Sequence, residues 1–255
     1  MKKFFLLLIM LLGVILSGCS NKAPQTTLDK IKERDYIIVG VKFDAKPFGY
    51  LENGEVKGLD IDIAKQIAKT ILLDENKIKF VEVTPEDRIS KLMSEEVDII
   101  VATMTDTQQR REIVDFSSPY YISGQAILCR KSSKVKSPAE LSHNKTVVVM
   151  GTTAEKTIRQ LYRKNGRTEI AKNYTTAFDI IKNEPDSCLI ADEGILLGFV
   201  SDNNGYIIFN KKLTTEPYAV AIRKEDTDLK DYVNRTINNL EASDELDEII
   251  KKWID

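Results

Sequence analysis

Strand-like and helix-like segments alternate along most of this chain, and this alternation limits the possible folds more than any other feature. Residues 36–41 form an apolar run that is typical of a buried strand, and residues 59–71 carry apolar side chains at helical spacing. Residues 78–83 alternate as a strand, residues 84–95 open with a Thr-Pro-Glu-Asp helix start, and residues 97–102 are apolar again. The pattern predicts an α/β fold with mostly parallel sheet.

A second set of elements follows the first. Strands are expected at residues 125–130, 146–150, 189–191 and 217–222, and helices at residues 137–140 (a capping box), from 151–153 onward, at 192–200, and as an amphipathic pair over 229–253 that breaks near Ser243. Two sets of elements predict two lobes, each with its own sheet.

The first twenty residues have the organisation of an export signal. Two lysines follow Met1, residues 4–16 are apolar apart from Gly13, and Leu-Ser-Gly precedes Cys19. The alternative is a short transmembrane anchor, but the apolar run is below the ~18–20 residues that a membrane span needs. The segment resembles a bacterial lipoprotein signal, which implies cleavage of residues 1–18, a lipid on Cys19, and residues 19–27 as a tether outside the cytoplasm.

Composition excludes several classes of protein. Hydrophobic residues make up 42% of the chain, and 37 basic against 39 acidic residues give a net charge of −2 without a basic block, so no nucleic-acid partner is expected. No cluster of Cys and His suggests a metal site, and no cofactor is expected. Cys129 and Cys188 could form one disulfide, but each borders an apolar run, which favours two buried thiols.

Polar residues at the carboxyl ends of the expected strands suit an α-amino acid, because open α/β sheets bind ligands there. An α-carboxylate is best held by a guanidinium with hydroxyl and backbone N–H donors, which Arg110, Thr103, Thr105 and the helix start at 151–153 could supply. Asp192, after an apolar strand, could accept from the α-ammonium. Each residue also has a plainer role: Arg110 as a solvated helix residue, Asp192 as a helix cap, and the threonines as strand ends.

The chain resembles the amino-acid substrate-binding proteins of bacterial ABC importers, of the polar-amino-acid type. The similarity spans the mature chain and is most specific at Met104-Thr105-x-Thr107-x-x-Arg110 and at Val114-Asp-Phe-Ser-x-Pro-Tyr-Tyr121, with Gly58-Leu-Asp-Ile-Asp-Ile-Ala64 and Lys251-Lys-Trp253 also matching. This resemblance implies a periplasmic-binding-protein-like fold of two lobes joined by a hinge with two crossings. Lobe 1 would span residues 28–119 and 219–255, lobe 2 residues 125–213, and the crossings residues 120–124 and 214–218.

The resemblance also implies roles for individual residues. The arginine at the position of Arg110 holds the α-carboxylate in such proteins, with help from the hydroxyls at Thr103 and Thr105. The Gly-Thr-Thr turn that contains Thr152 and Thr153 donates from lobe 2. The aspartate at the position of Asp192 takes the α-ammonium.

Two cations bear on the ligand's side chain. Lys42 stands where glutamine binders can carry an aspartate, and Arg88 resembles an arginine of acidic-amino-acid binders that is also present in cysteine binders. Both could equally be surface charges. Together they favour glutamate or aspartate as the ligand, with glutamine, cysteine or cystine as alternatives. Ala45 replaces an aromatic residue that covers the ligand in many members.

The predicted function is therefore capture of an amino acid and its delivery to an ABC permease, by a lipid-anchored monomer on the extracytoplasmic face of the cell membrane. An enzyme or sensor on the same fold is the rival hypothesis, but the candidate pocket offers no nucleophile with a paired base, so no catalytic residue is expected. The candidate binding residues are Lys42, Phe48, Arg88, Ala102, Thr103, Thr105, Arg110, Thr152, Thr153 and Asp192.

Overall fold

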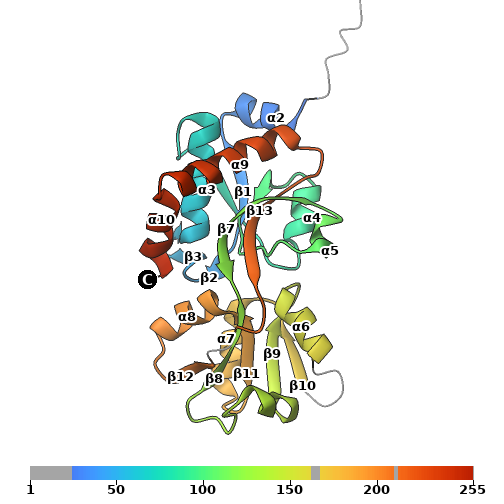
Figure 1. The fold of residues 1–255 in the computed structure, drawn as a ribbon, viewed down its shortest axis with the longest axis vertical. Coiled ribbons are helices and arrows are strands. Elements are labelled where there is room, and N and C mark those ends of the chain that lie inside the picture. The colour runs from blue at the N-terminus through green and yellow to red at the C-terminus, as the bar shows by residue number, and fades with distance from the viewer. Residues whose placement is uncertain (1–24, 162–166, 210–211, 255) are drawn as a thin grey trace, which may run out of the picture.

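The computed structural model describes residues 25–161, 167–209 and 212–254. In this part of the chain two lobes stand one above the other, each around its own five-stranded sheet (Figure 1). The predicted signal and Cys19 lie outside the described residues. The two-lobed α/β architecture predicted from the sequence is confirmed.

Lobe 1 contains a sheet with the strand order β5-β1-β6-β13-β7. Its strands are β5 (Ile78–Glu82), β1 (Ile37–Val41), β6 (Ile99–Ile100), β13 (Glu216–Ile222) and β7 (Asp115–Ser123). β1 pairs in parallel with β5 and β6, whereas β13 pairs antiparallel with β6 and β7. The sheet is therefore mixed, because β13 runs in the opposite direction to the other four strands.

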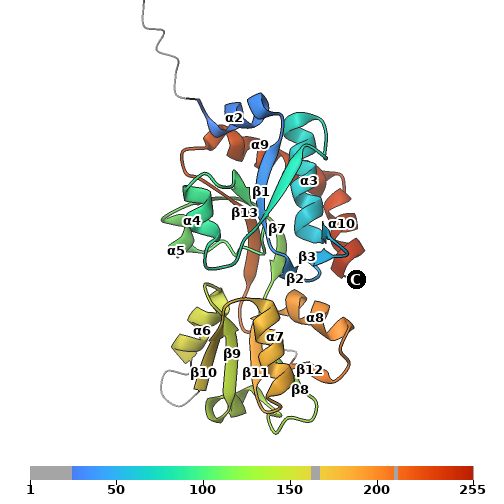
Figure 2. The same cartoon turned by 180° about the vertical axis from the view of Figure 1, so that it is seen from behind.

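Lobe 2 repeats this arrangement with the strand order β10-β9-β11-β8-β12. Its strands are β10 (Arg167–Ala171), β9 (Lys145–Val149), β11 (Cys188–Asp192), β8 (Gln125–Arg130) and β12 (Tyr206–Phe209). β9 pairs in parallel with β10 and β11, and β8 pairs antiparallel with β11 and β12. A small third sheet of β2 (Asp44–Ala45), β3 (Gly49–Glu52) and β4 (Glu55–Lys57) lies at the end of lobe 1 that faces lobe 2 (Figure 2).

Helices flank both sheets. Those of lobe 1 are α2 (Thr27–Arg34), α3 (Leu59–Leu72), α4 (Arg88–Met93), α5 (Gln108–Arg111), α9 (Thr227–Ala242) and α10 (Glu245–Ile254). Those of lobe 2 are the 3₁₀ helix η1 (Pro138–His143), α6 (Thr153–Leu161), α7 (Tyr174–Asn183) and α8 (Glu193–Ser201). Within the described residues, no helix has both the length and the apolar character needed to cross a bilayer.

Two local predictions differ from the structure. The predicted helix over residues 84–95 begins only at Arg88, because Thr84 and Asp87 exchange side-chain to backbone hydrogen bonds and close a separate turn first. Ser137 makes no capping hydrogen bond, and the segment after it is the 3₁₀ helix η1. The first signal thus precedes a shorter helix than predicted, α4, and the second precedes a 3₁₀ helix.

The expectation of two buried thiols is wrong, because Cys129 and Cys188 form a disulfide. The two residues stand directly opposite each other on the antiparallel strands β8 and β11, with their Cα atoms 4.5 Å apart. They are separated by 59 positions in the sequence. Apolar flanks report burial but not which strands are neighbours, so the pairing was not visible in the sequence.

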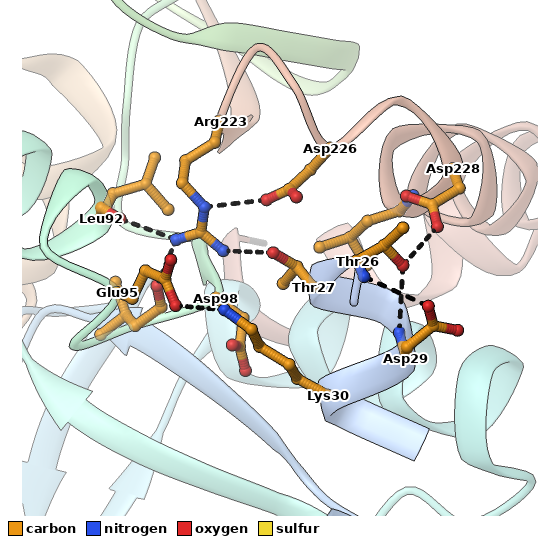
Figure 3. Close-up of polar contacts among 12 residues, drawn as sticks. Thr26, Thr27, Asp29, Lys30, Leu92, Glu95, Asp98, Arg223, Asp226 and Asp228 are labelled. Atoms are coloured by element: carbon orange, nitrogen blue, oxygen red, sulfur yellow. Dashed lines mark hydrogen bonds and ion pairs between the residues drawn. The ribbon is translucent and has the colours of Figure 1, made fainter. Parts of the chain in front are cut away.

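A buried arginine fixes the N-terminal helix of the described chain to lobe 1 (Figure 3). The Arg223 guanidinium donates to the carbonyls of Leu92 and Val97 and to Thr27 Oγ1, and it forms an ion pair with Asp226. Arg223 follows β13, so it joins helix α2, the end of helix α4 and the start of helix α9. Helix α2 consequently lies at the end of the molecule remote from lobe 2 (Figure 1).

Candidate functional site

The predicted binding residues meet where the two lobes touch. Lys42 follows β1 in lobe 1, and its ammonium lies 4.4 Å from the ring centre of Tyr174, the first residue of helix α7 in lobe 2. The backbone N–H of Tyr174 donates to Asp44 Oδ2 at 2.7 Å. Lys42 is 1% exposed, although it is a lysine at the end of a strand. The alternative that Lys42 is a surface cation is therefore wrong.

Burial strongly affects the charge state of Lys42. Desolvation lowers its pKa to about 8, and the nearby charge of Arg88 acts in the same direction. The carboxylates of Asp44, Asp192 and Asp60 oppose this shift. The pKa of Lys42 is thus low for a lysine and close to neutral pH, although three carboxylates lie around it.

Arg88 is also buried, at 2% exposure, and it points into the site from the first turn of helix α4. Its Nη1 donates to the carbonyl of Ala102 at 2.8 Å. Its Nε has no hydrogen-bond partner among the described residues. Burial, followed by the charge of Arg110, lowers the pKa of Arg88 to about 9. A buried guanidinium with an unused N–H is a strong indication of a missing acceptor.

The backbone turns sharply at Thr103, which has a left-handed φ of 45°. Its N–H donates to Asp60 Oδ2 at 2.9 Å, while the Tyr120 hydroxyl donates to Asp60 Oδ1 at 2.7 Å. The Thr103 hydroxyl is buried and has no partner within the described chain. Since Asp60 holds the turn, the Thr103 hydroxyl is presented to the site instead of pairing locally.

Arg110 lies in the short helix α5 and reaches across the boundary. Its Nη1 donates to the carbonyl of Thr105 at 2.7 Å, and its Nη2 donates to the carbonyl of Gly151 in lobe 2 at 3.2 Å. Burial lowers the pKa of Arg110, while Glu216 and Asp192 oppose the shift. An open groove of about 550 Å³ borders Arg110 and is lined from both lobes, by Pro85 and Thr152 among others.

The Gly-Thr-Thr turn begins helix α6, as predicted. Thr152 uses its hydroxyl locally, donating to the carbonyl of Val149 at 2.7 Å, whereas the Thr153 hydroxyl donates to Glu216 Oε2 at 2.9 Å. Glu216 is buried and also accepts from the Gln125 amide at 2.9 Å. Thr153 is therefore joined to the strands that connect the lobes, while Thr152 shapes its own turn.

Asp192 ends β11 and is 7% exposed. It occupies the cap position of helix α8, but its side chain makes no capping hydrogen bond and instead accepts from the Tyr218 hydroxyl at 2.5 Å. Burial raises the pKa of Asp192 to about 6, and the Tyr218 bond acts against the shift. A carboxylate that does not serve the helix start is available to a cationic group, as its predicted role requires.

Phe48 and Ala102 have structural roles next to the other predicted binding residues. The Phe48 ring packs edge-on against Tyr121 and Tyr218, with centroids 5.3 Å apart in each case, and a Cβ on Gly194 would lie 2.7 Å from it. Ala102 offers its carbonyl to Arg88. Phe48 thus contributes to the packing between the lobes.

Several residues that shape the site were not among those predicted. Asp60 lay in a quoted motif, but its buried role depends on contacts with β7 and with Thr103 that are distant in sequence. Tyr174, Tyr218 and Glu216 gave no local signal, because each acts through a partner on another element. Among the described residues, no group of His, Cys, Asp and Glu side chains could hold a metal ion.

Comparison with known proteins agrees with this geometry. The family model for bacterial extracellular solute-binding proteins, family 3, matches residues 37–255. The chain belongs to this family. It is 41% identical to the "ABC transporter glutamine-binding protein GlnH" of Bacillus subtilis, over 100% of this chain and 98% of the relative. The "Glutamine-binding protein" of Geobacillus stearothermophilus is 38% identical, over 86% and 91% of the two chains.

A solved structure of the same shape supports the assignment to family 3. The cysteine-binding protein of Campylobacter jejuni superposes with a TM-score of 0.85 at 32% identity, over 90% of this chain and 93% of that one. The relatives are named as binding proteins, which confirms the prediction that this family 3 protein is not an enzyme.

Proposed function

We propose that this family 3 protein binds L-glutamine between its lobes and delivers it to an ABC permease. Arg110 binds the α-carboxylate through the N–H groups that Thr105 and Gly151 leave free, and the buried Thr103 hydroxyl adds a further donor. Asp192 accepts from the α-ammonium. Its side chain is suited to this role because it makes no capping hydrogen bond to helix α8. These contacts would be common to any α-amino acid.

The charge balance at the other end of the site supports a neutral side chain, and this is the observation on which the ligand assignment rests. Lys42 and Arg88 provide two cations there, and Asp60 and Asp44 provide two carboxylates beside them. The cations are therefore already compensated within the protein. A ligand carboxylate would add an uncompensated negative charge to a buried site, whereas an amide can donate and accept without one.

The comparisons favour the same ligand. Two relatives that cover most of this chain are named as glutamine binders. The sequence leaves glutamine as an alternative to glutamate or aspartate. Lys42 and Arg88 favour an acidic ligand only while the acids beside them in the folded protein are left out. The similarity to glutamine binders and the charge balance both favour the alternative.

A role in transport also involves movement of the lobes and attachment to the membrane. The chain crosses between the lobes at residues 120–124 and 214–218, and movement there would open and close the site, with the ligand favouring the closed arrangement. A lipid on Cys19 would hold the mature protein to the outer face of the membrane through the tether. Lobe 1 over residues 28–119 and 219–255, and lobe 2 over residues 125–213, remain the proposed rigid units.

Isothermal titration of the purified protein with free amino acids tests the ligand. We expect L-glutamine to bind at least about tenfold more tightly than L-glutamate, L-aspartate, L-cysteine or L-cystine, and we expect L-arginine to be rejected because the site already holds buried cations. Tightest binding of an acidic amino acid would overturn the proposal.

A further inference from the structure

We propose that Asp60 is the specificity-determining residue of this site. Its negative charge compensates the buried cations Lys42 and Arg88, as the side-chain carboxylate of an acidic ligand otherwise would. The site therefore selects glutamine over glutamate. The inference rests on the proposed function and assigns its selectivity to one side chain. Asp60 belongs to helix α3 and would not contact the α-amino or α-carboxylate group of the ligand.

The contacts of Asp60 leave its charge available to the site. The carboxylate is fully buried, and its oxygens accept from the Tyr120 hydroxyl and the Thr103 N–H, at 2.7 and 2.9 Å. Both donors are uncharged, so no direct ion pair consumes the negative charge. Burial raises the pKa of Asp60 to about 6, against the hydrogen bonds from Tyr120 and Thr103 and against the charges of Lys42 and Arg88, which leaves the carboxylate ionised at neutral pH.

The two buried cations, Lys42 and Arg88, have no directly bonded counter-charge among the described residues. Lys42 lies over the Tyr174 ring, and Arg88 donates to a backbone carbonyl and has an unused Nε–H. Neither cation forms an ion pair within 4 Å among the described residues. Two buried cations held only by an aromatic ring and a carbonyl would attract an anionic ligand, because a nearby opposite charge is strongly favourable where water is excluded. Asp60 removes that attraction.

Charged and titratable groups from every neighbouring element enter this balance. They are Lys42 after β1, Asp44 in β2, Arg88 in helix α4, Arg110 in helix α5, Tyr120 in β7, Tyr174 in helix α7 and Asp192 at the end of β11. Replacing Asp60 by a neutral residue of the same shape changes the sum by one positive charge and leaves the other groups in place.

The test measures dissociation constants for L-glutamine and L-glutamate and takes their ratio. In Asp60→Asn, the preference for glutamine over glutamate should fall by about tenfold or more, since one uncompensated cation now favours the anionic ligand. Tyr120→Phe is the matched control: it removes one hydrogen bond to Asp60 and keeps the carboxyl group. At a pH high enough to keep that carboxyl ionised, affinity for both ligands can fall but their ratio should stay within about threefold of wild type.

A charge-restoring pair separates electrostatics from damage to the fold. Lys42→Met alone should raise the preference for glutamine, and Asp60→Asn combined with Lys42→Met should bring the ratio back to within about threefold of the wild-type value. Thermal unfolding confirms that each variant is folded. Should Asp60→Asn fail to fold, Lys42→Met still decides, because the proposal requires it to weaken glutamate binding more than glutamine binding.

Two results would overturn the inference. Equal weakening of both ligands in Asp60→Asn would show that Asp60 only holds the Thr103 turn, and an unchanged ratio in Lys42→Met would show that the charges do not select the ligand. Failure of the proposed function looks different: the wild-type protein would then prefer another amino acid, while the ratio could still respond to Asp60 and Lys42 as described.

Discussion

Replacing Gly198 by alanine should weaken ligand binding without touching the ligand. Gly198 lies in helix α8 of lobe 2, and a Cβ there would lie 2.2 Å from the carbonyl oxygen of Lys46 and 2.6 Å from its carbonyl carbon, both in the backbone of lobe 1. Ordinary contact begins near 3.4 Å. The two backbones must therefore separate by about 1 Å.

That separation would also disrupt other contacts that join the lobes. The Tyr174 N–H to Asp44 bond of 2.7 Å and the Arg110 to Gly151 bond of 3.2 Å would exceed hydrogen-bonding distance. At about 0.5–1.5 kcal/mol net for each of the two bonds, the closed arrangement loses about 1–3 kcal/mol. The exposed Lys46–Asp202 pair adds little. A loss of this size weakens affinity about 5- to 150-fold.

Titration calorimetry of Gly198→Ala, with small-angle scattering to follow closure, measures the effect. Gly205→Ala is the matched control, since nothing lies within 4 Å of a Cβ at Gly205 in the same lobe. The unfolding temperature of both variants should stay close to that of wild type. Wild-type affinity and wild-type compaction on ligand addition in Gly198→Ala would refute the reasoning.

Three further predictions follow from the same contacts. Arg110→Ala should cost about 2–5 kcal/mol of binding, and Arg110→Lys should rescue little of it because an ammonium cannot reproduce the planar fork; near wild-type affinity in titrations of either variant would contradict the anchor role. Affinity should fall as the pH drops below about 6, because the pKa of Asp192 is about 6 and its protonated form cannot pair with an ammonium; titrations at pH 7.5, 5.5 and 4.5 should show the decline, and a flat profile would exclude this role. Arg223→Met should lower the free energy of unfolding by about 3–5 kcal/mol in urea titrations while glutamine affinity is retained, since Arg223 lies far from the lobe boundary; an unchanged midpoint would show that the α2 contacts are dispensable.

Elements with strong local signals were predictable. The strand at residues 125–130 and the helix break near Ser243 were found where expected, because apolar periodicity and turn residues act within a few positions. The strand over residues 97–102 was predicted too long: regular pairing covers only Ile99–Ile100, and the backbone soon turns at Thr103. That turn depends on Asp60, which no local pattern reveals.

The site was likewise predictable only in part. Arg110, Thr153 and Asp192 lie together at the lobe boundary, as their motifs and strand-end positions indicated. The ligand's side chain was harder to predict, because Lys42 and Arg88 were visible as cations but their compensation was not. A charge balance is a property of elements brought together in space, so it could be counted only in the folded protein.

A crystal structure of the protein in complex with L-glutamine tests the central claim most directly. We expect the ligand carboxylate on Arg110, its ammonium on Asp192, and its amide between Arg88 and Lys42, with Asp60 still bonded to Tyr120 and Thr103. A ligand bound elsewhere, or in the reverse orientation with its ammonium away from Asp192, would contradict the account.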